Sequence, residues 1–338
     1  MKRYNKSNDS FEDFDNVNDI HKRASDDPLK HNVKLSKWQW IRTFIFSITV
    51  FPVRVVTFLI LCLLANLMAK IGLRGIDETE VQETQLNSRI SKFSQKTLII
   101  LSNIACSVCG FKFTVKGNIA PVNEASILVV APHSTFFDAF PKVCIDYVIL
   151  ASKGGPPASC LIAEEYRKIP IIGIFFQIYQ YIYVKRNDPC SRENTSRELM
   201  KRTSFNSHAD KDKRWPHIIF FPEGMCSNRK ALLPFKPGAF YPGKPVQPIT
   251  FRYTNENDTV TWTWDQSHGA ISIFWLTLTQ PFTNVEIDFL PVYYPNTEEK
   301  EDPKFYASNV RKLMAKHLDV PIYDITLNEV KERYSKKK

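Results

Sequence analysis

The stretch Ser126-Ile127-Leu128-Val129-Val130-Ala131-Pro132-His133-Ser134-Thr135-Phe136-Phe137-Asp138 decides the fold of this chain. Its first part, 126–131, is short, mostly apolar and rich in β-branched residues, which predicts a buried strand. After Pro132 the pattern predicts a loop and then a helix over 135–150. Two residues five apart on one helix point about 140° apart. A histidine in the loop can instead fold back, so the sequence predicts a contact between His133 and Asp138.

A histidine held by a carboxylate suits general-base chemistry. The carboxylate fixes the tautomer of the imidazole and leaves the second ring nitrogen free to take a proton from a substrate hydroxyl. Such help contributes about 10²- to 10⁴-fold to a rate. On this spacing alone, a histidine that only caps a helix is the alternative, so other motifs have to decide.

The rest of the chain alternates short apolar runs with longer helical patterns. We predict strands at 112–116, 126–131, 159–163, 179–184, 217–221, 246–252 and 285–289, and helices at 97–109, 135–150, 191–206 and 304–317. This order predicts an α/β fold in which helices flank a mixed β-sheet. The predicted organisation is a disordered polar segment (1–37), a membrane-embedded helical segment (38–74), a linker (75–96), one catalytic domain (97–325) and a basic tail (326–338).

Charge and composition indicate an anionic partner. The 338 residues carry a net charge of +10 and have a pI near 9.1, which suits an acidic membrane, a phosphorylated substrate or a nucleic acid. The aromatic residues fall in apolar runs instead of alternating with basic residues, so no nucleic-acid-binding pattern is present. We therefore expect a membrane partner and no nucleic acid. The polar start of the chain contains no secretory signal peptide.

Two apolar runs, 38–51 and 55–69, are separated by Pro52 and Arg54. Each run is shorter than the about 20 residues that cross a bilayer as a straight helix. A single kinked span and a re-entrant hairpin with Pro52 and Arg54 at its tip both remain open, with buried core helices as the alternative. Basic residues before and after the runs favour the hairpin, with both of its ends on the cytoplasmic side.

The seven cysteines are scattered and odd in number, so they indicate a reducing compartment and no disulfide framework. Cys106 and Cys109 have the spacing of a metal or redox site, but no second ligand pair accompanies them. We interpret them as thiols of the core and expect neither a metal nor a cofactor.

Two further stretches carry polar residues directly after apolar strands. The strand over 179–184 leads to Arg186, whose planar guanidinium suits a phosphate, with a solvated cation as the alternative. The strand over 217–221 leads to Glu223 and Gly224, and a glycine lets the backbone approach a ligand closely. Glu223 is predicted to hold a glycerol hydroxyl or to order cations near the phosphate, with a simple turn as the alternative. Lys236 adds another cation.

Together these motifs resemble the glycerolipid acyltransferase superfamily, and most of all its lysophosphatidylcholine acyltransferase branch. The resemblance rests on His-Ser-Thr-Phe-Phe-Asp (133–138), Glu-Gly-Met-Cys-Ser-Asn (223–228), Phe-Lys-Pro-Gly-Ala-Phe (235–240), Lys-Pro-Val-Gln-Pro (244–248) and Thr-Trp-Thr-Trp (261–264). It implies that His133 is the base and Asp138 its orienting partner. It also implies that Arg186 and the turn of Glu223 and Gly224 contact the glycerophosphate of the acceptor. Pro245 belongs to a strand block associated with binding of acyl-CoA or the acceptor, and Lys236 is a further predicted substrate-binding residue.

The resemblance implies a membrane-bound enzyme that moves an acyl chain from acyl-CoA to a lysophospholipid, expected to be lysophosphatidylcholine. The expected location is the endoplasmic reticulum membrane, with the catalytic domain on the cytoplasmic side. Lysophosphatidic acid or glycerol 3-phosphate as the acceptor remains open, as does a non-catalytic lipid-binding protein of the same fold. Phe136 and Phe137 stand where members acting on those smaller acceptors more often have Ser-Pro, which favours the bulkier phospholipid.

Two details complete the expectations. Met225 stands where this branch usually has a threonine, so a hydroxyl contact is lost there. The start of the helix near Ser134 is expected to stabilise the oxyanion that forms during acyl transfer.

Overall fold

The computed structural model describes residues 27–86, 90, 92–152, 155–185, 188, 190–208, 214–266 and 268–335. Its strands are β1 (Lys30–His31), β2 (Phe111–Lys116), β3 (Ile127–Ala131), β4 (Ser159–Ala163), β5 (Ile182–Val184), β6 (Ile218–Phe220), β7 (Val246–Tyr253), β8 (Asp265–Gln266) and β9 (Thr283–Phe289). Its α-helices are α2 (Lys37–Gly72), α3 (Glu78–Glu83), α4 (Lys92–Val108), α5 (Ala139–Ala151), α6 (Gly173–Ile178), α7 (Ser191–His208), α8 (Ala270–Leu278), α9 (Thr297–Glu301), α10 (Pro303–Leu318) and α11 (Leu327–Ser335).

Seven strands form a mixed sheet in the order β2-β9-β7-β3-β6-β4-β5. All neighbours in it are parallel except β7 and β9. The predicted α/β fold with a mixed sheet is therefore confirmed, and each predicted strand has a counterpart. The largest difference concerns the run over 179–184, where β5 begins only at Ile182 because Gln180 adopts a positive φ of 52° in a turn.

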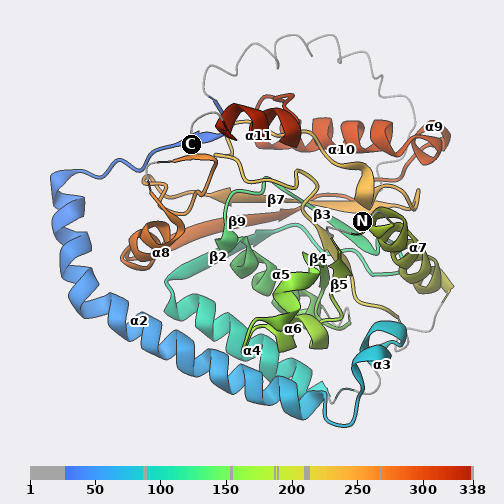
Figure 1. The fold of residues 1–338 in the computed structure, drawn as a ribbon, viewed down its shortest axis with the longest axis horizontal. Coiled ribbons are helices and arrows are strands. Elements are labelled where there is room, and N and C mark those ends of the chain that lie inside the picture. Colours follow the sequence, from blue (N-terminus) through green and yellow to red (C-terminus); the bar gives the residue numbers. More distant parts are fainter. Residues whose placement is uncertain are drawn as a thin grey trace.

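Helices cover both faces of the sheet (Figure 1). Successive residues of β3 alternate between two buried clusters, so Leu128 and Val130 face α4, α5 and α8, whereas Ile127 and Val129 face α10. All five residues of β3 are buried, as expected for a central strand between two layers of helices. The loop after β3 opens at the carboxyl edge of the parallel strands, where α/β proteins usually bind ligands.

Helix α2 is one uninterrupted helix of 36 residues that contains Pro52 and runs along the outside of the domain (Figure 1). The hairpin with its tip at Pro52 and Arg54 is therefore wrong. The helix bends around the domain without a break (Figure 1). The guanidinium of Arg54 holds it there, because it donates to three backbone carbonyls at the end of α8, those of residues 278, 280 and 281, at 2.6–2.8 Å. By length and composition α2 could cross a membrane.

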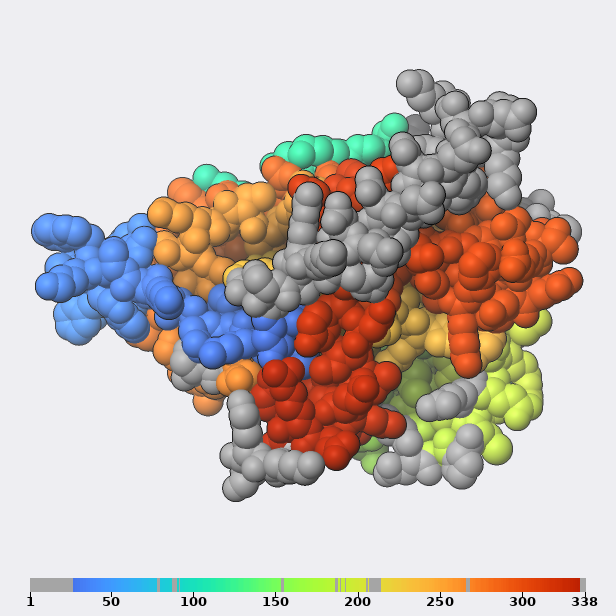
Figure 2. All heavy atoms as spheres, turned by 90° about the horizontal axis from the view of Figure 1, so that it is seen from above, coloured from blue at the N-terminus to red at the C-terminus, as the bar shows by residue number. Residues whose placement is uncertain are grey.

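Both ends of the described chain are ordered and meet each other. Disorder was predicted for 1–37, but residues 27–36 contain β1, which pairs with β8; residues 1–26 lie outside the description. The predicted basic tail contains α11. A small buried cluster joins both ends to the loop after β6, and its members are Leu29, Met225, Leu233 and Val330. We call this cluster the terminal clamp, and Figure 2 shows the blue N-terminal segment beside the dark red α11.

Candidate active site

His133 and Asp138 form the contact that the sequence predicts. His133 lies in the loop between β3 and the 3-10 helix Phe136–Asp138, and its Nδ1 is 2.8 Å from Oδ2 of Asp138. The Asp138 side chain is 2% exposed, whereas that of His133 is 26% exposed. A buried carboxylate therefore holds one nitrogen of an imidazole that solvent reaches. The catalytic role of the pair stays a prediction.

The carboxylate of Asp138 is fully engaged. Its Oδ2 also accepts from the backbone N–H groups of Ser134 (2.8 Å) and Thr135 (3.2 Å). Its Oδ1 accepts from the hydroxyl of Tyr253, in β7, at 2.7 Å. These bonds fix the carboxylate in one orientation, and they engage the backbone N–H groups of Ser134 and Thr135. The expectation that the start of the helix near Ser134 stabilises the oxyanion stays a prediction.

Opposing effects act on the pKa of His133. Burial alone would lower it, but the hydrogen bonds with Asp138 and with the thiol of Cys226 raise it, and the net result lies well above the usual value. Asp138 occupies Nδ1, which leaves Nε2 as the nitrogen that can accept a proton.

Glu223 holds the backbone of His133 from the inside of the domain. Its side chain is almost completely buried, and its two oxygens accept from the backbone N–H groups of His133 (2.6 Å) and Leu233 (2.8 Å). Burial raises the pKa of Glu223 to about 7, against the lowering effect of these two bonds. These two bonds position the loop that carries His133, and the contact between Glu223 and the acceptor stays a prediction.

Gly224 and Lys236 lie together at the surface next to Glu223. Gly224 has a φ of 62°, and a Cβ on it would lie 2.3 Å from Nζ of Lys236. Only a glycine combines this backbone conformation with this close approach. Lys236 is exposed, so its ammonium group accompanies the glycine on the open side of the loop.

Two other predicted binding residues remain predictions. Arg186 lies outside the described residues. Pro245 directly precedes β7, whose Val246 is level with Ile127 at the start of β3. His133 follows the opposite end of β3, about 16 Å away at 3.3 Å per residue. Binding of acyl-CoA or of the acceptor near Pro245 therefore involves the end of β3 away from His133.

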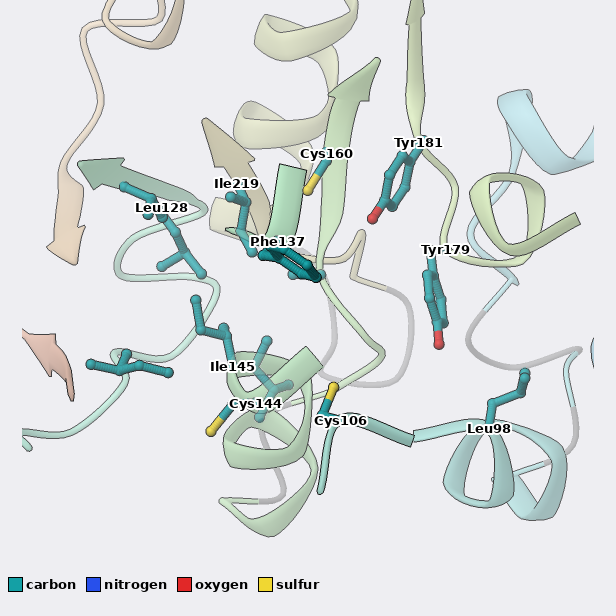
Figure 3. Close-up of a cluster of buried hydrophobic side chains, with 14 of the residues drawn as sticks. Leu98, Cys106, Leu128, Phe137, Cys144, Ile145, Cys160, Tyr179, Tyr181 and Ile219 are labelled. Atoms are coloured by element: carbon teal, nitrogen blue, oxygen red, sulfur yellow. The ribbon is translucent and has the colours of Figure 1, made fainter. Parts of the chain in front are cut away.

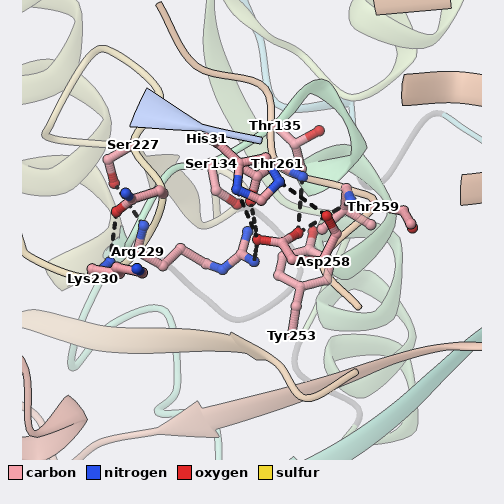
Figure 4. Close-up of polar contacts among 12 residues, drawn as sticks. His31, Ser134, Thr135, Ser227, Arg229, Lys230, Tyr253, Asp258, Thr259 and Thr261 are labelled. Carbon is pink, nitrogen blue, oxygen red and sulfur yellow. Dashed lines mark hydrogen bonds and ion pairs between the residues drawn. The ribbon is translucent and has the colours of Figure 1, made fainter. Parts of the chain in front are cut away.

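A polar network that the motifs did not predict surrounds Asp258 and Arg229 (Figure 4). The guanidinium of Arg229 donates to Asp258 at 2.6 Å and lies 4.8 Å from the ring centroid of Tyr253. Asp258 also accepts from Thr261 at 2.6 Å, and its carbonyl oxygen is 3.0 Å from Nε2 of His31. The network connects the N-terminal segment to Tyr253 and hence to Asp138. Its residues are far apart in sequence, which is why no local pattern indicates them.

Met225 and Phe137 both point inward. Met225 is 8% exposed and packs in the terminal clamp, so its apolar side chain anchors the Glu223–Cys226 loop from the inside. Phe137 is 2% exposed and lies in the large cluster between the sheet and α5, where Figure 3 draws it near Ile145. Of the two phenylalanines thought to favour a bulky acceptor, only Phe136 is accessible, at 39%.

Comparisons with known proteins confirm the resemblance that the motifs indicate. Residues 112–252 match the family model described as Acyltransferase.

The curated relatives belong to the branch that the motifs indicated. The chain is 40% identical over 304 residues to lysophosphatidylcholine acyltransferase 1 of Homo sapiens (89% of this chain, 53% of the relative). It is 38% identical over 304 residues to the lysophosphatidylcholine acyltransferase of Drosophila melanogaster (90% and 54%). It is 39% identical over 313 residues to lysophosphatidylcholine acyltransferase 2B of Mus musculus (92% and 57%). The chain spans about half the length of these relatives.

Among solved structures, the chain is similar to the 1-acyl-sn-glycerophosphate (LPA) acyltransferase PlsC from Thermotoga maritima. The TM-score is 0.49 at 16% identity, over 84% of this chain and 99% of that chain.

Proposed function

We propose that the protein transfers an acyl group from acyl-CoA to the free hydroxyl of a lysophospholipid, with lysophosphatidylcholine as the preferred acceptor. The observation that carries the proposal is the His133–Asp138 pair, in which a buried carboxylate holds Nδ1 of an imidazole that is 26% exposed. The names of the relatives support the choice of acceptor.

In the proposed reaction, Nε2 of neutral His133 takes the proton of the acceptor hydroxyl while the oxygen attacks the thioester carbonyl. Asp138 keeps the proton of the imidazole on Nδ1 and stabilises the imidazolium that forms. The tetrahedral intermediate then expels the thiolate of coenzyme A, which recovers the proton from the imidazolium. The step forms an ester, breaks a thioester and uses no metal or cofactor.

The proposed enzyme is attached to a membrane through α2, with the endoplasmic reticulum and a cytoplasmic catalytic domain as the proposed location. Most large apolar side chains of α2 are exposed, among them Trp38, Phe44 and Leu63. Polar residues on another face of α2 bind the domain: Arg42 to Gln280, Ser47 to Trp275 and Asn66 to Ile171. These contacts extend over about 36 Å of the helix. Because the domain lies along α2, the helix is proposed to lie in one leaflet and not to cross the bilayer.

The proposal is tested with purified protein, radiolabelled acyl-CoA and lysophosphatidylcholine. His133→Ala is expected to lower kcat by about 10²- to 10⁴-fold. His317→Ala is the matched control, because His317 also contacts a carboxylate, Asp288, at 3.0 Å, but lies on α10. Full activity of a folded His133→Ala protein would overturn the mechanism. Binding of lysolipid without turnover by the unmodified protein would favour a non-catalytic lipid-binding protein, and lysophosphatidic acid in the same assay tests the other acceptor.

A further inference from the structure

We propose that Phe136 and Trp262 form an aromatic corner that binds the trimethylammonium group of a choline headgroup. The proposal rests on the proposed function and names the residues that select its acceptor. The ring centroids of Phe136 and Trp262 are 5.9 Å apart, and the two ring planes meet at an angle of 70°. Each residue is 39% exposed, so both rings present surface to solvent beside the catalytic pair.

The position of both rings is tied to the catalytic loop. Phe136 opens the 3-10 helix that ends at Asp138. The backbone N–H of Trp262 donates to the carbonyl oxygen of Ser134, the residue after His133, at 2.9 Å. The backbone of both aromatic residues is therefore fixed to the loop that carries His133, and the proposal places the headgroup against the corner while the acceptor hydroxyl is at His133.

The backbone of 261–264 alternates, which turns Trp262 outward. Thr261 and Thr263 are 0% and 7% exposed, whereas Trp262 and Trp264 are 39% and 41% exposed. Thr261 is held by Asp258, to which its hydroxyl donates at 2.6 Å. The exposure of Trp262 is therefore imposed by a fixed neighbour.

The chemistry of the corner suits a quaternary ammonium ion. Aromatic faces attract cations through their quadrupole, and such cages recognise choline because its methyl groups cannot be satisfied by hydrogen bonds. Among the described residues, no lysine or arginine of the chain lies over the ring of Phe136 or Trp262, whereas the nearby Tyr253 is covered by Arg229. The corner is thus open to a cation from outside.

The experiment compares three acceptors with the same acyl chain: lysophosphatidylcholine, lysophosphatidylethanolamine and lysophosphatidic acid. Trp262→Leu keeps apolar bulk but removes the aromatic face, and Trp262→Phe keeps a face. Trp262→Leu and Phe136→Leu are expected to lower kcat/KM for lysophosphatidylcholine by about 3- to 30-fold and to leave lysophosphatidic acid within about twofold. Trp262→Phe is expected to retain most of the activity. Trp264→Leu is the matched control, because Trp264 stacks on Tyr334 instead.

A soluble probe separates headgroup binding from membrane contact. Tetramethylammonium is expected to inhibit the unmodified protein and Trp264→Leu competitively with lysophosphatidylcholine, and to inhibit Trp262→Leu much less. Equal losses for all three acceptors, with weaker binding of Trp262→Leu to phosphatidylcholine vesicles, would overturn the proposal in favour of a membrane contact. Turnover without any headgroup discrimination overturns only the corner, whereas no turnover of any lysolipid by the unmodified protein overturns the proposed function and the corner with it.

Discussion

At the scale of single residues, the structure separates groups that face the substrate from groups that hold them. His133 is accessible, whereas Asp138 and Glu223 are buried and hold its ring and its backbone N–H by hydrogen bonds. Tyr253 acts one step further away, because its hydroxyl donates to Asp138. The spacing of five positions predicted the contact between His133 and Asp138. Tyr253 is 115 positions from Asp138, and no local pattern indicates a partner at that distance.

The raised pKa of His133 predicts how activity depends on pH. The imidazole accepts a proton only when neutral, so kcat/KM is expected to rise with pH through an apparent pKa above the usual value of about 6.5. Asp138→Asn is expected to reduce activity by about 10²- to 10⁴-fold. It removes the main group that raises the pKa of His133, so the pH at which the remaining activity increases is expected to shift downward. Rates measured between pH 5 and 9 check this. An unchanged inflection in Asp138→Asn would contradict it.

The raised pKa of Glu223 predicts how stability depends on pH. Its folded-state pKa of about 7 exceeds the ordinary value of 4.5, so the folded protein holds a proton that the unfolded chain releases. The contribution of Glu223 is therefore fully present below pH 4.5 and is lost as pH rises through 7, on the order of 3 kcal/mol in all.

Glu223→Gln is expected to flatten this loss between pH 5 and 8. It also lowers activity by roughly tenfold, because an amide nitrogen cannot accept from a backbone N–H. Chemical unfolding at both pH values measures the change, with Glu165→Gln, at an exposed position, as the control. If the free energy of unfolding of Glu223→Gln changes with pH as steeply as that of the unmodified protein, Glu223 is not the group that titrates.

At the scale of elements, β3 and the sheet around it were predictable and α2 was predictable only in part. A continuous apolar run identified β3, because a buried parallel strand needs no polar face. The hairpin prediction failed because Pro52 and Arg54 were interpreted by local signals. The partners of Arg54 lie more than 220 residues away, and a proline is tolerated where neighbouring structure supports the helix.

Arg54→Ala is expected to loosen α2 from α8. Each charged hydrogen bond contributes about 1.5–3 kcal/mol, and the variant leaves three carbonyl groups without their donor, so thermal stability in detergent is expected to fall by several degrees. Limited proteolysis near the end of α8 should accelerate as well. Val56→Ala, at an exposed position on the same helix, serves as the control, and equal melting temperatures for both variants would contradict the docking role.

At the scale of the whole molecule, the terminal clamp closes the structure behind the active site. Composition indicated disorder for the start of the chain and a loose basic tail, because both are polar. Their few apolar residues, Leu29 and Val330, nevertheless meet at Met225 with no exposed surface left. This non-local packing also explains why an apolar residue stands at position 225. The sequence alone indicated only that a threonine hydroxyl is absent there.

Leu29→Ala is expected to destabilise the protein by about 2–5 kcal/mol, as for other leucines removed from a closed core. Since Met225 then loses a neighbour, kcat is expected to fall while KM for the acceptor changes little. Unfolding curves and steady-state rates test both effects, and Leu64→Ala, at an exposed position of α2, is the control. A loss confined to KM would indicate that Leu29 contributes to binding instead.

The clamp also sets an order of events during biosynthesis. The apolar helix α2 leaves the ribosome more than 250 residues before α11, which completes the packing around Met225. The nascent chain therefore carries the complete α2 well before the support of its catalytic loop exists. Termination before residue 327 would yield a polypeptide that keeps α2 but lacks the part of the terminal clamp that α11 supplies.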